Sequence, residues 1–200
     1  MTKFTRQTVN LPQLIQMITD RLSEKQSLTV AIDGRCGGGK TTLAQALQAH
    51  FSATLIHADD FFLRPEQRMP ERFAEPGGNM DRERLIAEVL LPLKIGLPFS
   101  YRPFDCSTLS LAEPISVDPA PLTIVEGSYS CHPDLWDCYD LHIFVDVDSE
   151  EQLRRITKRN GAAMAKVFAE RWIPLEERYF KAFSICEKCE IVFGLSPYNA

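Results

Sequence analysis

The residues best suited to do chemistry form one short run, 34–41, which reads Gly-Arg-Cys-Gly-Gly-Gly-Lys-Thr. This run matches the phosphate-binding pattern G-x-x-x-x-G-K-[ST] in full. Its glycines allow backbone N–H groups to converge on phosphate oxygens, and the helix that follows adds the positive end of its dipole. Lys40 is expected to reach the β- and γ-phosphates, and the Thr41 hydroxyl to complete the shell of a Mg²⁺ ion. The residues predicted to bind the nucleotide are Gly34, Gly37, Gly38, Gly39, Lys40, Thr41 and Thr42.

Two acidic residues each follow a short apolar run, Asp59 after 53–57 and Glu126 after 122–125. Ligands of open parallel sheets gather at the carboxyl ends of the strands. A carboxylate at Asp59 can accept the proton of an attacking alcohol and help to hold a metal ion. Glu126 follows its run like the acid of a Walker B element, which binds Mg²⁺ directly or through water. The alternatives are that Asp59 caps the next turn and that Glu126 is a strand-end acid in a turn.

Four cations lie within the run Arg-Arg-Ile-Thr-Lys-Arg at 154–159 of this otherwise acidic chain. Phosphoryl transfer moves charge onto phosphate oxygens, and a mobile Arg that closes over them is a recurrent source of rate. We predict that at least one of these cations contacts phosphate, with Arg155 and Lys158 ahead of the other two. The alternative is that the two glutamates at 150 and 151 pair with the arginines four residues later on an exposed helix.

Short apolar runs typical of buried strands alternate with helical patterns along the chain. Strands are predicted at 28–32, 53–57, 122–125, 141–147 and 191–193, and helices at 11–24, 41–50, about 149–160 and from near Asp81. This alternation predicts an α/β fold with a P-loop NTPase-like parallel sheet flanked by helices. We expect a single domain over 1–200, with a lid at about 154–174 and irregular insertions on the acceptor side at about 63–80 and 96–121.

The composition of the 200-residue chain excludes several classes of function. A net charge of −5 argues against binding polymeric nucleic acid or an anionic membrane through bulk electrostatics. No apolar run approaches the roughly 20 residues that span a bilayer, and the first ten residues lack a hydrophobic signal region, so a cytoplasmic location is expected. The six cysteines are expected to be mostly reduced, and the single C-x-x-C of Cys186 and Cys189 is a weak zinc signal because no second pair accompanies it.

These motifs together resemble the uridine kinase family of P-loop small-molecule kinases, whose relatives include nicotinamide riboside kinase, pantothenate kinase and phosphoribulokinase. The resemblance rests on 34–41, on Asp-Asp-Phe-Phe at 59–62, on Asp81 at a helix start, on Val-Glu-Gly at 125–127 and on the twin arginine at 154. It implies transfer of the γ-phosphate of MgATP to a primary hydroxyl, typically the 5'-OH of a ribonucleoside such as uridine. Asp59 would be the general base, and Thr41, Asp59 and Glu126 would surround Mg²⁺.

The resemblance also assigns the acceptor, although the sequence departs from the family there. Asp81 would bind vicinal ribose hydroxyls, or else it stabilises the start of its own helix. Tyr101 and Arg102 lie where the family has a base-binding segment, but the histidine that commonly follows in uridine kinases is missing. The run at 59–62 is closer to the nicotinamide riboside kinase pattern. A nucleotide acceptor is disfavoured because its phosphate needs extra positive charge, but five arginines keep it open, and an acidic acceptor such as pantothenate or a sugar phosphate would use them too: Arg64, Arg68, Arg72, Arg82 and Arg84.

Other classes of function remain as alternatives. A P-loop GTPase switch is disfavoured because the guanine-reading pattern N-K-x-D is missing from the sequence. A non-catalytic nucleotide-binding module would be favoured only if the acids lay far from the γ-phosphate. His57 is expected to be an ordinary packed or surface histidine. The oligomeric state is open, a homo-oligomer included, and the expected partner is a small-molecule alcohol.

Overall fold

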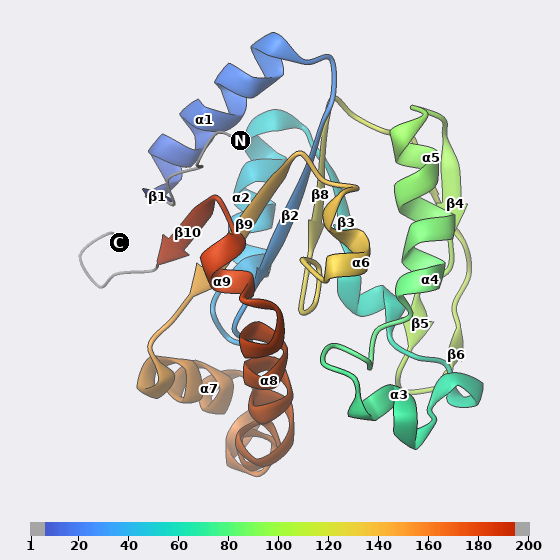
Figure 1. Cartoon of the computed structure of the whole chain (residues 1–200), viewed down its shortest axis with the longest axis vertical. Helices are drawn as coiled ribbons and strands as arrows, with labels where there is room; N and C mark the ends of the chain where they lie inside the picture. Colours follow the sequence, from blue (N-terminus) through green and yellow to red (C-terminus); the bar gives the residue numbers. More distant parts are fainter. Residues whose placement is uncertain (1–6, 195–200) are drawn as a thin grey trace.

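A parallel sheet forms the centre of the molecule (Figure 1), as the sequence predicted. The computed structural model describes residues 7–194, so both ends of the predicted 1–200 domain lie outside the described residues. The sheet has six parallel strands in the order β1-β10-β9-β2-β8-β3. Their bounds are β1 Gln7–Thr8, β2 Leu28–Gly34, β3 Thr54–His57, β8 Leu122–Glu126, β9 Leu141–Asp146 and β10 Ile191–Gly194. The sequence did not predict β1, which is only two residues long.

Helices cover both faces of the sheet because its strands are apolar on both sides. Successive residues of a strand point to opposite faces. Val30 and Ile32 of β2 pack with α1 (Leu11–Glu24) and α2 (Lys40–Phe51) in one core cluster. Ala31 packs in a second cluster with residues of α4 (Arg82–Leu85), α6 (Pro133–Trp136) and α8 (Ile173–Phe183). Within residues 7–194, no helix is both long enough and apolar enough to cross a membrane.

The phosphate-binding run leaves the end of β2 through a backbone that only glycine fits well. Gly34 has φ of +135°, and a Cβ at this position would lie 2.1 Å from the carbonyl oxygen of Val145 on β9. Gly39 has φ of 104° and directly precedes α2. The loop is therefore held against the neighbouring strand, and its last residue turns the chain into the helix.

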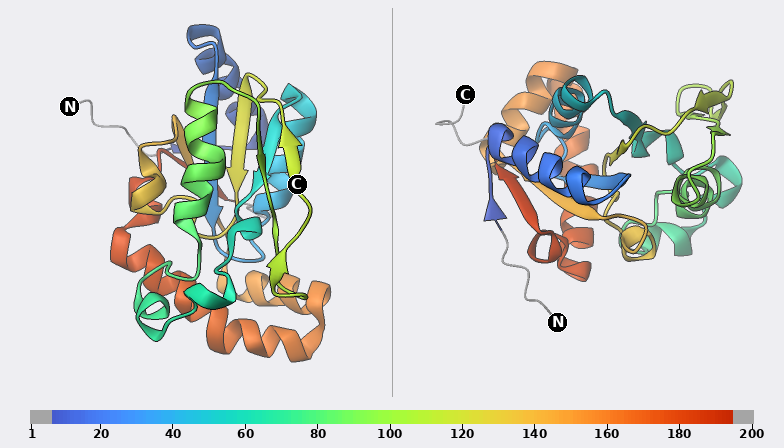
Figure 2. Two further views of the ribbon diagram at one scale, coloured as in Figure 1. Left: turned by 90° about the vertical axis from the view of Figure 1, so that its right-hand side faces the viewer. Right: turned by 90° about the horizontal axis from the view of Figure 1, so that it is seen from above.

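The segments between β3 and β8 gather at one side of the sheet (Figures 1 and 2). The first holds short 3₁₀ segments at Ala58–Phe61 (η1) and Pro65–Gln67 (η2), and α3 (Pro70–Ala74). After α4 come a π-helical turn at Ile86–Leu90 and α5 (Leu91–Lys94). The insertion at 96–121 is not wholly irregular: β4 (Phe99–Tyr101) pairs with β7 (Ile115–Val117), and β5 (Phe104–Asp105) pairs with β6 (Ser110–Leu111). Sequence analysis missed these strands because each is two or three residues long.

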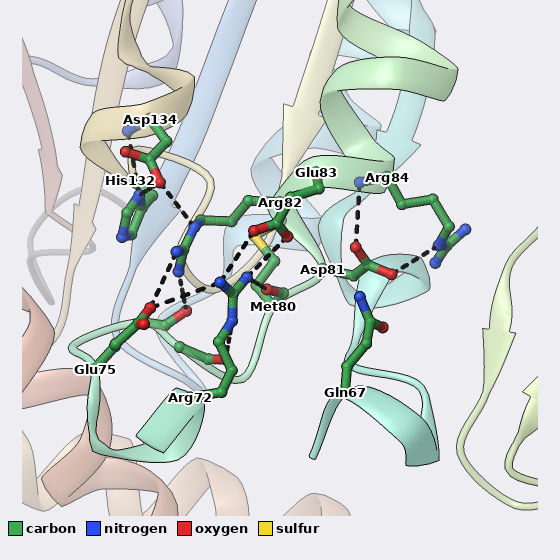
Figure 3. A network of polar contacts seen from close by, with 12 residues as sticks. Gln67, Arg72, Glu75, Met80, Asp81, Arg82, Glu83, Arg84, His132 and Asp134 are labelled. Carbon is green, nitrogen blue, oxygen red and sulfur yellow. Dashed lines mark hydrogen bonds and ion pairs between the residues drawn. The ribbon is translucent and has the colours of Figure 1, made fainter. Parts of the chain in front are cut away.

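Ion pairs hold the first of these segments in place (Figure 3). Arg72 binds both carboxylate oxygens of Glu83, at 3.0 and 2.9 Å, and donates to the carbonyls of Gly78 and Met80. Arg82 binds Glu75 at 3.1 Å and Asp134 of α6 at 3.0 Å. These partners fix the segment to α4 and α6.

The segment predicted as a lid, about 154–174, covers most of one helix, a π-helical turn and the start of a second helix. The first is α7 (Ser149–Val167), in which Gly161 has φ of 79° and ψ of 164°, so the helix is kinked and interrupted there. The predicted helix at 149–160 ends at this break. A π turn at Phe168–Trp172 leads into α8, and α9 (Ile185–Lys188) follows. Figure 1 shows α7 and α8 at the end of the sheet toward which β2 runs.

Candidate functional site

A cavity of about 890 Å³ lies at the carboxyl ends of β2, β3 and β8. The phosphate-binding run, Asp59, Glu126 and the predicted lid all contribute to its wall. Of the residues predicted to bind the nucleotide, Gly37, Gly39, Lys40, Thr41 and Thr42 line it. Gly34 and Gly38 are not among the lining residues and lie against β9. The structure therefore brings the phosphate loop and the two strand-end acids to one place.

Lys40 is held by its own loop. Its Nζ donates to the carbonyl oxygens of Gly34 at 2.7 Å and Arg35 at 3.3 Å, and the side chain is largely buried. These contacts keep the ammonium in the cavity wall at the start of α2. It can therefore approach an anion bound by the loop without a large movement of the backbone.

Glu126 connects the phosphate loop with β3. The Thr41 hydroxyl lies 3.1 and 3.3 Å from its two carboxylate oxygens, and His57 Nδ1 lies 2.7 Å from Oε1. The β3–β8 register places His57 opposite Glu126. The hydrogen bond to Glu126 is the main cause that raises the pKa of His57. His57 therefore belongs to the site through Glu126, although the sequence predicted an ordinary packed or surface histidine. Like the two acids, it lies at the end of a strand, and this position was the feature of the sequence that could have indicated its role.

Asp59 follows β3 directly and lines the cavity, where its carboxylate is open to solvent while protein surrounds it on other sides. Burial raises its pKa, the charge of Lys40 opposes this, and Glu126 and Glu176 raise it further. Gly127 is required beside it, since a Cβ there would lie 2.8 Å from the Cβ of Ala58 and 3.2 Å from Asp59 Oδ1. A carboxylate with a raised pKa is a better proton acceptor than an ordinary one.

The oxygen atoms of Thr41, Asp59 and Glu126 suit a hard cation. Mg²⁺ prefers oxygen ligands, keeps several waters, and is usually held by one or two carboxylates together with substrate phosphates. Within residues 7–194, no group of three or more His, Cys, Asp or Glu side chains is arranged to hold a metal ion by itself. The oxygen donors of Thr41, Asp59 and Glu126 therefore fit a Mg²⁺ ion that is also held by substrate phosphates.

The cations of α7 do not all face the cavity. Arg155 lines it, binds Glu151 at 2.7 Å, and donates to the carbonyls of Gly38 at 3.2 Å and Gly37 at 3.5 Å. Arg159 and Arg171 also line it, whereas Lys158 does not. The expected pair four residues apart forms at Glu151 and Arg155, but Arg154 binds Glu151 rather than Glu150.

The three residues assigned to the acceptor are not among those that line the cavity. Asp81 is 1% exposed; it caps α4 by accepting from the backbone N–H of Arg84, and it lies 3.4 Å from the guanidinium groups of Arg64 and Arg84 (Figure 3). The helix-start alternative for Asp81 is therefore the one that the geometry shows.

Tyr101 and Arg102 contact other parts of the insertions. The Tyr101 ring stacks on Phe61 with centroids 5.3 Å apart, and its hydroxyl donates to Asp60 at 3.2 Å. Arg102 donates to the carbonyl oxygens of residues 111 and 112, at 2.9 and 2.7 Å. Both side chains therefore support the loops around them in this structure.

Glu176 of α8 is a cavity residue that no sequence motif indicated. It is 4% exposed, accepts from the backbone N–H of Cys36 at 2.9 Å, and accepts from the Ser128 hydroxyl at 2.8 Å. It thereby connects α8 with the phosphate loop and with the segment after β8. These partners lie 140 and 48 residues away along the chain, so local spacing could not reveal the contacts.

Asp33 is a second residue that no sequence motif indicated; it does not line the cavity and is fully buried directly before the phosphate loop. Its Oδ1 accepts from the N–H groups of Gly34 at 2.7 Å and Tyr129 at 3.3 Å. Its Oδ2 accepts from the N–H of Cys131 at 3.0 Å and from the Tyr179 hydroxyl at 2.8 Å. One carboxylate thus joins β2, the segment after β8, and α8. Burial raises its pKa to about 6, opposed by a nearby lysine charge and these hydrogen bonds.

We expect Asp33→Asn to remove a pH dependence from stability. Because the folded pKa is above the ordinary 3.8, the folded state holds this proton more tightly than the unfolded chain. The contribution of Asp33 to the free energy of unfolding therefore falls by about 3 kcal/mol as the pH rises from about 4 to about 6. Urea unfolding of both proteins at about pH 4.5 and about pH 7 should show the stability of the unmodified protein falling relative to that of the variant as pH rises. A difference that does not change with pH would contradict this.

Comparison with known proteins agrees with this geometry. No protein-family model matches the chain. The uridine kinase of Anoxybacillus flavithermus is 26% identical over 161 residues, which cover 73% of this chain and 75% of that protein. The uridine kinase of Streptococcus agalactiae is 28% identical over 146 residues, which cover 68% of this chain and 69% of that protein. The sequence is thus similar to uridine kinases over more than two thirds of its length.

Solved structures of other proteins share the fold of this chain. A possible uridine kinase from Bacillus stearothermophilus matches with a TM-score of 0.67 at 18% identity, covering 92% of this chain and 98% of that one. The D-glycerate 3-kinase from Cryptococcus neoformans matches with a TM-score of 0.69 at 16% identity, covering 95% and 96%. The fold is that of a P-loop kinase. The relatives that are named uridine kinase support a phosphotransferase, as the sequence predicted.

Proposed function

We propose that this P-loop kinase fold transfers the γ-phosphate of MgATP to the primary hydroxyl of a small molecule. The observation that carries the proposal is the convergence of the phosphate loop, Thr41, Asp59 and Glu126 on one cavity. A phosphate-binding loop alone would be expected in any nucleotide-binding protein. A carboxylate such as Asp59, exposed to the same cavity with a raised pKa, favours a reaction that removes a proton from an alcohol.

The nucleotide side would be held by the loop and by cations. The N–H groups of 34–41 and Lys40 would bind the phosphates, and Arg155 would exchange the loop carbonyls for phosphate oxygens. Thr41, Glu126 and Asp59 would hold Mg²⁺, which would neutralise charge on the phosphates when it is bound. The contact of Glu126 with His57 orients its carboxylate toward Thr41.

Asp59 would act as the general base on the acceptor side. Its carboxylate accepts the proton of the acceptor hydroxyl as the hydroxyl oxygen forms a bond to the γ-phosphorus. The bond between that phosphorus and the β–γ bridging oxygen breaks, and ADP leaves with its electrons. The products are ADP, the phosphorylated alcohol and a protonated Asp59, which returns its proton to solvent.

Uridine is the first acceptor to test, because the curated relatives above carry that name. ADP release from MgATP would be measured with uridine, cytidine, nicotinamide riboside, pantothenate and ribulose 5-phosphate, and with water alone. Release that depends on one acceptor would support the kinase reaction. Equal release with water alone would indicate an ATPase, and tight ATP binding without release would indicate a binding module.

A further inference from the structure

The arginines around the acceptor side differ in their partners. Five of them lie between residues 64 and 84, and four have carboxylate partners within 4.0 Å. These are Arg64 with Glu66 and Asp81, Arg72 with Glu75 and Glu83, Arg82 with Glu75 and Asp134, and Arg84 with Asp81 and Glu88. Their charges are already neutralised by the protein, and Figure 3 shows Arg72, Arg82 and Arg84 turned toward these acids.

Arg68 is the exception among the five. Its Nε donates to the carbonyl of Leu63 at 3.0 Å, and its guanidinium lies 5.4 Å from the ring centroid of Phe104. Within residues 7–194 no carboxylate forms an ion pair with it. Of the five arginines it is also the one that lines the main cavity. The backbone and the ring hold one edge of the guanidinium, which leaves its terminal N–H groups for a ligand.

Arg68 and Asp59 line the same cavity. Its wall also contains the apolar side chains of Phe62, Leu63, Phe73 and Leu109, and Asn79 adds an amide. An acceptor whose hydroxyl meets Asp59 therefore shares this cavity with the guanidinium of Arg68.

From this arrangement we infer that the acceptor carries an anionic group, a carboxylate or a phosphate, and that Arg68 binds it. The inference rests on the kinase function proposed above and specifies its substrate class. A guanidinium binds both oxyanions through paired N–H donors. The residues that the resemblance assigns to a neutral nucleoside, Asp81 and Tyr101, have other partners and are not among the residues that line the cavity. Asp81 accepts from the backbone N–H of Arg84 and pairs with two arginines, and the Tyr101 hydroxyl donates to Asp60.

The test compares acceptors in pairs that differ in charge. The pairs are glycerate with glycerol, pantothenate with pantothenyl alcohol, and ribulose 5-phosphate with ribulose, and uridine is added as a neutral nucleoside. Initial rates of ADP release at saturating MgATP give kcat/KM for each. We expect the anionic member of the accepted pair to be preferred about tenfold or more. The pair that responds separates a carboxylate from a phosphate.

Variants assign the preference to one side chain. Arg68→Gln should lower kcat/KM for the anionic acceptor about tenfold to a hundredfold, mainly through KM, and leave its neutral partner unchanged. Arg68→Lys, which keeps the charge but loses the paired donors, should fall between them. Arg64→Gln is the matched control, since Arg64 lies on the same segment, is paired with acids, and does not line the main cavity.

Each outcome decides something different. Preference for uridine or for the neutral member of a pair, or a preference that persists in Arg68→Gln, overturns the inference and leaves the kinase function standing. Equal losses for charged and neutral acceptors in Arg68→Gln mean that Arg68 is structural, which also overturns it. Release that no acceptor in the panel increases counts against the kinase function itself, and the inference falls with it.

Discussion

Asp59→Asn is expected to reduce acceptor-dependent turnover by about a hundredfold to ten-thousandfold, the range typical for loss of a general base. The amide has nearly the same size, so the cavity keeps its shape, but the amide cannot take the proton of the acceptor hydroxyl. ATP binding depends chiefly on the loop and should remain. Turnover is measured as ADP release with the accepted alcohol, and ATP binding by calorimetry.

Asp60→Asn is the matched control for this experiment. It makes the same chemical change at the next residue, whose carboxylate accepts from the Tyr101 hydroxyl and does not line the cavity. We expect its turnover to stay close to that of the unmodified protein. If Asp59→Asn were equally active, the general-base assignment would be wrong, and if it lost ATP binding, its main role would be in holding the metal and nucleotide.

Lys40→Ala should lower turnover about a hundredfold or more and weaken ATP binding, because it removes the cation best placed to stabilise charge on the transferring phosphoryl group. The variant also loses two contacts to loop carbonyls, so thermal melting must be recorded to show that the fold persists.

Lys25→Ala provides the comparison for Lys40→Ala. It removes another ammonium that binds an acid, Asp140, before the opposite end of β2. Its turnover should be unaffected. A folded Lys40→Ala protein with normal turnover would show that the loop binds phosphate through its backbone alone.

Much of the fold could be predicted because its signals are local. The apolar runs at 28–32 and 122–125 are strands in the structure, since a strand buried on both faces must be apolar throughout. The phosphate loop is also local, because one turn between a strand and a helix requires its glycines. Asp59 and Glu126 were found for a related reason: each lies at the carboxyl end of such a strand.

The remaining site residues depend on contacts that no local pattern encodes. Asp33 and Glu176 each meet partners from distant segments, and their roles arise only when β2, the segment after β8, and α8 come together. Arg68 could not be distinguished from the other four arginines by sequence, because they differ in their ion pairs and in whether they line the cavity, and both depend on the folded structure. The roles that the resemblance implies for Asp81, Tyr101 and Arg102 depend on the paths of the loops that carry them. Local sequence does not determine those paths.

The part of the cavity wall proposed to bind the acceptor (the acceptor wall) and the residues proposed to bind the phosphates (the phosphate grip) come from different segments of the chain. The grip comes from the turn after β2 and from the end of β8, both tied to the sheet. Most of the acceptor wall comes from one uninterrupted stretch between β3 and β8, which carries Phe62, Arg68, Asn79 and Leu109. Substitutions in that stretch outside Asp59 would alter which molecule is bound and leave the phosphate-binding residues and the proposed general base unchanged. Proteins with this arrangement could therefore come to use different acceptors while they keep the same phosphate-transfer reaction.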